Sequence, residues 1–399
     1  MNRQVRCQQP PAFPPTAPYS RQAHDRSSTS IPERPIMKRH ALAALLFSAG
    51  IAALPALAKP PTPPLPAMGA DLSATTVSGI SSGGFMAAQL ATAYSARFVG
   101  VGVIAAGPYY CAGTYPSLSM FQNATTSCMT PAIAATAANG ATSFANARRF
   151  AAEGLIDPVQ NLTRQRVYAF SGAGDRTVKT IVVDQVEQYY RLAGVPPERI
   201  LYRKHPEAGH SIVIDDDDDV PCATTAPPYI NNCGFIQSHE LLAHLYGPGK
   251  PANTGVPAGQ IIVFDQREFI KGSQTSMNAN GYAYVPRYCT TNACNVHVAF
   301  HGCQQGAHVI GDQFYRGTGY NEYADTNRLI ILYPQAGVSK GMPVNPQGCW
   351  DFWGYSNTPG FPPFYAKGAP QMAAVMAMID RLGQPRGAAN AAPAGNPQP

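Results

Sequence analysis

Charge is scarce in this 399-residue sequence, because only 13% of the residues are Asp, Glu, Lys or Arg and the formal net charge is +6. Most of that excess belongs to residues 1–58, which contain seven Lys or Arg and two Asp or Glu, so the remaining 341 residues have a formal charge of only +1. A nearly neutral chain has no electrostatic basis for binding the phosphate backbone of nucleic acids. We therefore expect no nucleic-acid partner.

Internal repeats and C-x-x-C pairs are also absent. Zinc is the alternative use of the cysteines, but it is disfavoured without such pairs, and we expect no metal site. After residue 58, no long Ser/Thr-rich or Pro-rich linker separates a second module. We expect one domain over residues 59–385, a flexible tail over residues 386–399, and a monomer.

The beginning of the chain has the pattern of an export signal. The basic segment Met37–His40 precedes an uncharged apolar run, Ala41–Leu54, and an A-x-A sequence ends at Ala58. This order predicts a signal peptide over residues 37–58, with Met37 as the true start and a secreted or periplasmic protein. A transmembrane anchor is disfavoured because the run is short and Pro55 follows it. Residues 1–36, rich in Pro, Ser, Gln and Arg, are expected to be a disordered or untranslated leader.

Eight cysteines follow the predicted signal peptide, and an even number in an exported chain favours disulfides over free thiols. Eight cysteines allow 105 pairings, so spacing gives a preference only. Short loops favour the pairs Cys111–Cys128, Cys222–Cys233 and Cys289–Cys294. The remaining pair is then Cys303–Cys349.

Apolar β-rich segments alternate with helical ones along the rest of the chain. The predicted strands are 98–106, 166–170, 200–203, 260–264, 296–300 and 329–333, and the predicted helices include 178–193, 237–245 and 370–382. Strands of this kind that alternate with helices predict an α/β protein with a mostly parallel central sheet and helices on both faces.

A G-x-S-x-G sequence at residues 79–83 is the most informative motif of the chain. The β-branched segment 74–78 precedes it and the apolar helical segment 84–90 follows it. That context is typical of a nucleophile elbow, in which a sharp strand-to-helix turn exposes the serine hydroxyl. The alternative is an ordinary turn of small residues with an exposed serine. We predict Ser81 as a nucleophile.

A serine nucleophile needs a base, and the base needs an orienting acid. Asp175 follows the predicted strand 166–170 on a glycine-rich turn, and His210 follows the predicted strand 200–203 beside Gly209. The order Ser, Asp, His is that of α/β-hydrolases. Asp175 has an alternative role as a simple turn residue, and Asp184 is a second, helical candidate for the acid. The other histidines downstream of Ser81 that compete with His210 are His205, His239, His244, His297, His301 and His308.

Two backbone N–H groups usually stabilise the oxyanion that forms in acyl transfer. One should come from Ser82, the residue after the nucleophile. The second usually comes from a His-Gly loop that precedes the elbow, but here the only such sequence, His301-Gly302-Cys303, lies far downstream. We therefore predict a circularly permuted α/β-hydrolase in which Cys303 N–H is the second donor and His301 shapes the loop.

These pieces resemble the polyhydroxyalkanoate depolymerase family of esterases, in particular its single-domain, circularly permuted poly(3-hydroxybutyrate) depolymerases. The matching segments are 77–86, Gly174-Asp175 with Val178, 209–211, 300–303 and 349–353, which together extend over roughly residues 70–380. The resemblance implies Ser81 as nucleophile, His210 as base, Asp175 as its orienting acid, and Ser82 and Cys303 as oxyanion donors. Many extracellular members have a separate polymer-binding domain, which we do not find in this sequence.

The expected function is that of an exported serine esterase that cleaves poly(3-hydroxybutyrate) or its oligomers through an acyl-enzyme, with no cofactor and a polyester or oligoester substrate as partner. Two alternatives stay open. One is a feruloyl or acetyl esterase that acts on plant polysaccharide, since the same broad family contains such enzymes. The other is a non-catalytic protein that binds polyester or lipid.

Aromatic residues near the predicted site are candidates for the substrate surface. Trp350 and Trp353 are the only tryptophans and lie beside Cys349, which a bond to Cys303 would bring next to the oxyanion loop. The alternative is that either tryptophan belongs to the core. Tyr109 is a further candidate, with Tyr110 and Tyr229.

A run of five acids, Asp215–Asp219, follows the His210 segment. Calcium is conceivable, but the run lacks the glycine and the spaced ligands of a calcium loop. We expect a solvated surface loop.

Overall fold

A computed structural model describes residues 61–217, 219–272 and 274–387. The chain divides into two units after Lys59, and every described residue belongs to the second, which starts at Pro60. The predicted leader and signal peptide therefore lie outside the described residues. Within the described part of the chain, no helix has the length and apolar character needed to cross a membrane.

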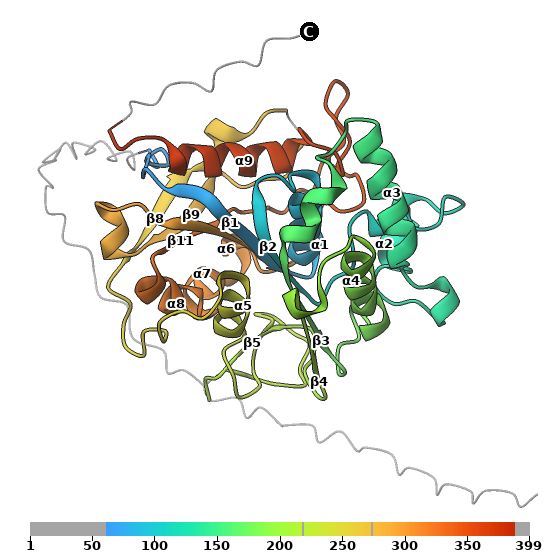
Figure 1. Cartoon of the computed structure of the whole chain (residues 1–399), viewed down its shortest axis with the longest axis horizontal. Helices are drawn as coiled ribbons and strands as arrows, with labels where there is room; N and C mark the ends of the chain where they lie inside the picture. Colours follow the sequence, from blue (N-terminus) through green and yellow to red (C-terminus); the bar gives the residue numbers. More distant parts are fainter. Residues whose placement is uncertain (1–60, 218, 273, 388–399) are drawn as a thin grey trace, which may run out of the picture. The chain divides into compact units, whose positions relative to one another are not determined.

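An eight-stranded sheet forms the centre of this unit, in the order β4-β3-β2-β1-β10-β11-β9-β8 (Figure 1). Neighbouring strands from β4 to β11 are parallel, and β9 is antiparallel to both β11 and β8. Its strands are β1 (Asp71–Ile80), β2 (Phe98–Ile104), β3 (Arg166–Gly172), β4 (Ile200–His205), β8 (Gln260–Asp265), β9 (Asn280–Val285), β10 (Asn295–Phe300) and β11 (Leu329–Tyr333). A small second sheet contains β5 (Ile212–Ile214), β7 (Ile230–Asn232) and β6 (Val220–Pro221).

The mostly parallel sheet was predicted from the alternating pattern, and each predicted strand is present within a few residues. Strand β9 was not predicted, because its alternation of Tyr and Ala beside Gly281 lacks the aliphatic run that marks the buried parallel strands.

Helices cover both faces of the large sheet. They are α1 (Ser82–Ala93), α2 (Met120–Thr125), α3 (Gly140–Ala152), α4 (Thr180–Leu192), α5 (Gln237–Tyr246), α6 (Ala307–Ile310), α7 (Gln313–Gly317), α8 (Tyr320–Asn327) and α9 (Pro370–Gly383). Short 3-10 helices are η1 (Cys111–Gly113), η2 (Ala134–Thr136), η3 (Val159–Arg164), η4 (Pro197–Arg199), η5 (Gln266–Phe269) and η6 (Arg287–Thr290). One buried cluster joins the sheet to α1, α3, α4 and α9, and a second joins the opposite face to α5, α7 and α8.

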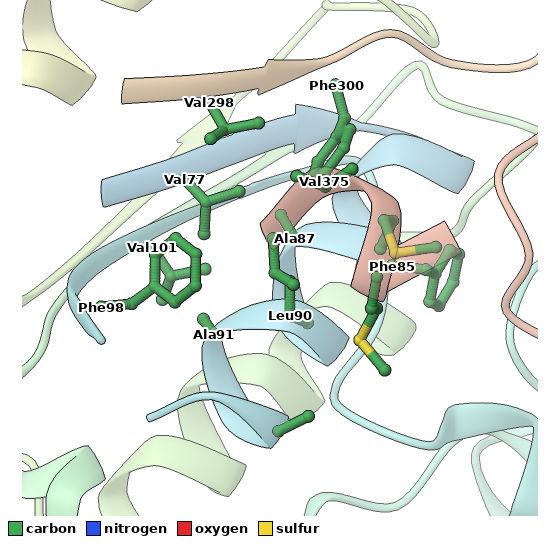
Figure 2. Close-up of a cluster of buried hydrophobic side chains, with 14 of the residues drawn as sticks. Val77, Phe85, Ala87, Leu90, Ala91, Phe98, Val101, Val298, Phe300 and Val375 are labelled. Atoms are coloured by element: carbon green, nitrogen blue, oxygen red, sulfur yellow. The ribbon is translucent and has the colours of Figure 1, made fainter. Parts of the chain in front are cut away.

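Figure 2 shows how the first cluster holds the elbow strand in place. Val77 of β1, Val101 of β2 and Val298 of β10 lie on neighbouring strands and belong to one buried cluster with Leu90 of α1. The next residue along β10, Ala299, belongs to the cluster on the other face, as the two-residue side-chain period of a strand requires. Each Å² of apolar surface that is buried contributes about 25 cal/mol of stability. This packing is therefore the main term that fixes the centre of the sheet.

The strand order also explains the unusual position of the His-Gly loop in the sequence. Strand β1 has the early strands β2–β4 on one side and the late strands β10, β11, β9 and β8 on the other. The two ends of the fold lie together, because Met68 N–H and Ala70 N–H both donate to the Leu382 carbonyl, at 3.1 and 2.9 Å. Adjacent ends are the geometry that permits circular permutation, and the late strands occupy the place of strands that usually precede the elbow.

Four disulfides are present in the preferred pairing, Cys111–Cys128, Cys222–Cys233, Cys289–Cys294 and Cys303–Cys349. Their sequence separations run from 5 to 46 residues. The pairing predicted from loop length is therefore confirmed.

Candidate active site

Ser81 occupies the turn between the last residue of β1 and the first residue of α1. Its backbone has φ 56° and ψ −126°, a region that residues with a Cβ rarely adopt and that is held only by the surrounding structure. Ser81 N–H donates to the Ile104 carbonyl at 2.9 Å, and the Ser81 carbonyl accepts from Phe85 N–H at 3.0 Å. These bonds to β2 and α1 fix the turn, and the side chain faces a cavity.

Both glycines of the motif are required by close backbone approaches. A Cβ on Gly79 would lie 2.3 Å from the Gly83 carbonyl oxygen and 2.9 Å from Phe300 Cβ. A Cβ on Gly83 would lie 2.4 Å from the His301 carbonyl oxygen. Real Cβ contacts are never this short, so the motif glycines let the elbow turn tightly and let the end of β10 approach it.

The His-Gly-Cys turn lies directly beside the elbow. Strands β1 and β10 pair in parallel with Gly79 opposite Phe300, so both chains reach the same edge of the sheet. A Cβ built on Gly302 would lie 3.2 Å from Ser81 Cβ. The structure thus brings together the two sequence segments that the predicted permutation required.

Asp175 and His210 form a buried pair on the neighbouring strand ends. His210 Nδ1 lies 2.8 Å from Asp175 Oδ2, and the two side chains are only 6% and 0% exposed. Asp175 Oδ1 accepts from Thr177 N–H at 2.8 Å and from Val178 N–H at 2.9 Å. With these donors the carboxylate holds the ring by Nδ1–H, which leaves the Nε2 lone pair free to accept a proton.

His210 and Ser81 line the same cavity, and His210 is the only histidine among the described residues that does so. In the described structure, the Ser81 hydroxyl makes no hydrogen bond to the His210 ring, whose Nδ1 is bonded to Asp175. Such bonds between nucleophile and base are often long before substrate binds. Asp184, the other candidate acid, lies on α4 and instead accepts a hydrogen bond from Tyr202 OH at 2.8 Å.

The two predicted oxyanion donors belong to the residue after Ser81 and to the His-Gly-Cys turn beside it. Ser82 is the first residue of α1, and the first N–H groups of a helix have no partner within the helix. Cys303 lines the cavity. On either side of it, Gly302 N–H donates to Gln305 Oε1 at 2.7 Å and Gln304 N–H donates to the Gln347 carbonyl at 2.8 Å. Within the described residues, Cys303 N–H has no hydrogen-bond partner in this turn.

Ser82 and Cys303 are both attached to the same dipeptide, Cys349-Trp350. Cys303 is bonded to Cys349 through the disulfide, and Ser82 Oγ accepts from Trp350 N–H at 3.2 Å. This double attachment links the elbow, the His-Gly-Cys turn and the C-terminal loop region in one local framework.

Comparison with known proteins agrees with this geometry. A poly(3-hydroxybutyrate) depolymerase of Delftia acidovorans is 42% identical over 324 residues, which cover 80% of this chain and 61% of that protein. A polyhydroxybutyrate depolymerase of Talaromyces funiculosus is 35% identical over 336 residues, 80% of this chain and 92% of that protein. The chain belongs to the polyhydroxybutyrate (PHB) depolymerase family.

Solved structures give the same result. The PHB depolymerase from Penicillium funiculosum matches with a TM-score of 0.69 and 32% identity over 80% of this chain and 98% of that one. A PHB depolymerase with a serine replaced by alanine, complexed with an R3HB trimer, matches with a TM-score of 0.70 and the same identity and coverage. These likenesses also identify the fold as the α/β-hydrolase type. No protein-family model matches the chain.

The cavity beside Ser81 has a volume of about 690 Å³ and mostly apolar walls. Trp353 lines it, as expected for a substrate-binding residue. Besides Ser81, His210, Cys303 and Trp353, the walls contain Phe121, Ala124, Thr125, Met129, Thr177, Tyr229, Gln304, Met342, Pro343, Val344, Asn345, Pro346, Gln347, Cys349, Phe352 and Tyr355. A space of this size and character suits a PHB depolymerase, whose family name refers to a polyester with a hydrocarbon side group at each unit.

Two of the predicted substrate residues belong to the core instead. Trp350 is fully buried and packs against Phe300, with ring centroids 4.7 Å apart. Tyr109 is also fully buried, and its hydroxyl donates to the Tyr365 carbonyl at 2.8 Å. Neither lines the cavity. The prediction for these two residues is wrong because their large apolar surfaces fill the space behind the cavity wall.

Asp351, which no sequence motif singled out, fixes the wall that contains Trp353. Its Oδ1 accepts from the N–H groups of Trp353, Gly354 and Tyr355 at 2.7–3.2 Å, and Oδ2 accepts from Ser356 N–H and Oγ–H at 2.9 and 2.6 Å. Burial raises the pKa of this carboxyl, and the hydrogen bonds oppose that rise. An acid placed just before a turn with Gly is a recognisable signal for such a cap.

His301 has the structural role predicted for it. Its Nε2 accepts from Ala336 N–H at 3.1 Å, so Nδ1 carries the proton and donates to the Gly302 carbonyl at 2.7 Å. Burial lowers the pKa of His301 to about 4, which keeps the ring neutral. The ring shapes the turn and is not positioned as a base.

Metal-ligating side chains gather at one place in the described chain, where His205 lies beside Cys222 and Cys233. Those two cysteines form a disulfide, so they have no thiolate to offer a metal. His297 and His301 have H-x-x-x-H spacing, which the expectation of no metal overlooked, but His297 bonds to the hydroxyls of Thr76 and Ser78 at 2.7 and 2.8 Å. Asp215, Asp216 and Asp217 are exposed, as expected for a surface loop.

Proposed function

We propose that this protein is an exported serine esterase that hydrolyses poly(3-hydroxybutyrate) and its oligomers through an acyl-enzyme intermediate. One observation carries the proposal. His210, which is bonded to the buried Asp175, and Cys303 line the same apolar cavity as Ser81, although they come from segments far apart in the sequence. The four disulfides support export. We further propose that residues 59–385 act as one catalytic domain and that the protein works as a monomer.

In the first half of the reaction, Ser81 Oγ attacks the carbonyl carbon of an ester unit while His210 Nε2 takes the hydroxyl proton. The carbonyl oxygen becomes an oxyanion that accepts hydrogen bonds from Ser82 N–H and Cys303 N–H. The tetrahedral intermediate collapses, the bond to the ester oxygen breaks, and His210 gives its proton to that oxygen. One part of the polymer leaves with a free hydroxyl end, and the other part stays bound to Ser81 as an ester.

In the second half, a water molecule takes the place of the departed hydroxyl. His210 removes a proton from the water as it attacks the acyl carbon, and the second oxyanion uses the same two donors. When the bond to Ser81 Oγ breaks, His210 returns the proton to the serine, and the product leaves as a carboxylic acid that releases its remaining proton to solvent. Asp175 holds Nδ1–H and stabilises the imidazolium that forms twice.

Comparing the esterase activity of wild type with that of Ser81→Ala decides whether the protein is a catalyst or only binds its ligand. Wild type should cleave p-nitrophenyl butyrate, and Ser81→Ala should not. Equal rates for the two proteins would remove Ser81 as the nucleophile. Release of 3-hydroxybutyrate from amorphous polymer should exceed release of acetate or ferulate from xylan, and the opposite ratio would favour an esterase of plant polysaccharide.

A further inference from the structure

Gln305 is a buried amide next to the Cys303 turn, with only 1% of its surface exposed. Its Oε1 accepts from Gly302 N–H at 2.7 Å. Its Nε2 donates to the carbonyls of Pro228 and Tyr229, at 2.9 and 3.1 Å. One side chain therefore joins the turn after β10 to the segment that leads into β7, and its acceptor and both of its donors are used.

The bond to Gly302 determines which N–H group of the turn faces the cavity. Gly302 N–H is taken by Gln305, and Gln304 N–H is taken by the Gln347 carbonyl at 2.8 Å. Gln304 has φ 60°, a left-handed conformation that reverses the chain directly after Cys303. The two engaged N–H groups belong to the peptide planes directly before and after the Gly302–Cys303 plane, which carries Cys303 N–H, and so they restrict the orientation of that N–H.

The bonds at the other end of Gln305 reach the side of the cavity that contains the base. The Tyr229 ring stands edge-on to the His210 ring, with centroids 6.2 Å apart and an angle of 78°. The Tyr229 carbonyl also accepts from Ile212 N–H at 3.0 Å, two residues after His210. The Gln305 amide is thus bonded to the oxyanion turn at one end and to the neighbours of the base at the other.

We propose that Gln305 is a positioning residue that sets the distance between the Cys303 N–H donor and His210. This inference rests on the proposed function and adds to it a determinant of kcat. Oxyanion donors act where charge develops in the transition state, and removing one typically lowers kcat by about 10²–10³-fold. A displaced donor should cost less, so we expect kcat to fall by about 10–100-fold in Gln305→Met while KM changes less than threefold.

Gln165→Met is the matched control. Gln165 is also fully buried, and its Nε2 also donates to two backbone carbonyls, those of Ala91 and Phe98, at 2.9 and 3.3 Å. It does not line the cavity. Both variants lose a buried amide of the same size, so both should lose thermal stability, but only Gln305→Met should lose kcat on p-nitrophenyl butyrate. Equal kcat values in the two variants would overturn the proposal.

A boronic acid that forms a tetrahedral adduct with a serine hydroxyl gives a second readout. Transition-state analogues report transition-state binding, so the Kd of butylboronic acid should rise in Gln305→Met by about the factor lost in kcat/KM. Wild type must cleave the ester and Ser81→Ala must not; if wild type is inactive, the proposed function fails independently of Gln305. A Kd unchanged by Gln305→Met would contradict the positioning role.

Gln305→Glu tests the same role even if the Met variant does not fold. A protonated carboxyl has one acceptor for Gly302 N–H and one donor for a carbonyl, whereas a carboxylate has no donor and faces two carbonyl oxygens. The ratio of variant to wild-type kcat should therefore rise as the pH falls, since dividing by wild type removes any pH dependence that the two proteins share. A ratio that is the same at every pH, in protein shown to be folded by circular dichroism, would reject the proposal.

Discussion

Gly79 of β1 and Phe300 of β10 are paired Cα partners in adjacent parallel strands, although more than half of the sequence separates them. This register places the end of each strand at the same edge of the sheet, so the Ser81 elbow and the Cys303 turn emerge together. The proposed oxyanion site therefore depends on how closely these two strands pack.

Replacing Gly79 should break that approach. In Gly79→Ala the new Cβ would lie 2.3 Å from the Gly83 carbonyl oxygen, and relieving this overlap should cost about 1–3 kcal/mol or more of folding free energy. We expect a lower melting temperature together with loss of esterase activity. Gly317→Ala is the control, because a Cβ there meets nothing within 4 Å. Similar stability and activity in the two variants would show that the elbow tolerates expansion.

The identity of the acid is tested by replacing each of the two candidates. Asp175→Asn should lower kcat by about 10⁴-fold with little change in KM, since an amide no longer stabilises the correct ring tautomer and the imidazolium. Asp184→Asn should retain near-wild-type kcat, because Asp184 contacts Tyr202 and Lys204 on the outer surface of α4. Steady-state kinetics of both variants on p-nitrophenyl butyrate makes the comparison, and a larger loss in Asp184→Asn would reassign the acid.

The groups with local signals were the ones predictable from the sequence. Ser81 lies in a motif whose glycines are required by contacts within the turn itself, and Asp175 and His210 each follow a strand at the same edge of the sheet. The partner of that motif, Cys303, was predictable because its His-Gly sequence is specific wherever it occurs along the chain.

The cavity walls were not predictable in the same way. Phe121 belongs to α2, whereas Met342 and Val344 belong to one loop segment far downstream, and nothing in their local sequences shows that these segments meet around Ser81. Trp350 and Tyr109 have the composition expected of a substrate surface, but whether a large aromatic side chain faces a cavity or the core depends on packing. Bridging side chains such as Gln305 are likewise defined by contacts between distant loops.

The disulfides should differ in their effects on activity. Replacing both cysteines of the Cys303–Cys349 pair by serine removes a link with a sequence separation of 46 residues, for which loop entropy predicts a loss of about 4 kcal/mol. The same change in the Cys289–Cys294 pair, with a separation of 5, should cost about 2 kcal/mol. Only the first change detaches the Cys303 turn from its anchor. Calorimetry should show the difference in stability, and kinetics on folded protein should show a lower kcat for the Cys303–Cys349 double variant. Equal kcat in the two double variants would contradict the predicted difference in activity.

Trp353 and Trp350 should separate binding from stability. Trp353→Ala removes an aromatic wall of the cavity and should raise KM for a soluble 3-hydroxybutyrate oligomer by about tenfold, the factor for roughly 1.4 kcal/mol. Trp350→Ala empties a core position and should cost about 3–5 kcal/mol of folding free energy. Chemical denaturation and oligomer kinetics on both variants give the answer. A stability loss for Trp353→Ala as large as that for Trp350→Ala would mean that Trp353 is also a core residue.

The neutral state of His301 predicts how stability depends on pH. Burial lowers the pKa of His301 from 6.5 to about 4, so between these values the unfolded chain binds a proton that the folded protein does not. Stability therefore falls as the pH drops below about 6.5, and this ring alone should cost about 2 kcal/mol between pH 7 and pH 5. His301→Gln keeps one donor for the Gly302 carbonyl and one acceptor for Ala336 N–H but does not titrate. Urea unfolding at the two pH values should show a loss about 2 kcal/mol smaller in the variant than in wild type, and an equal loss in both would mean that His301 is protonated in the folded protein.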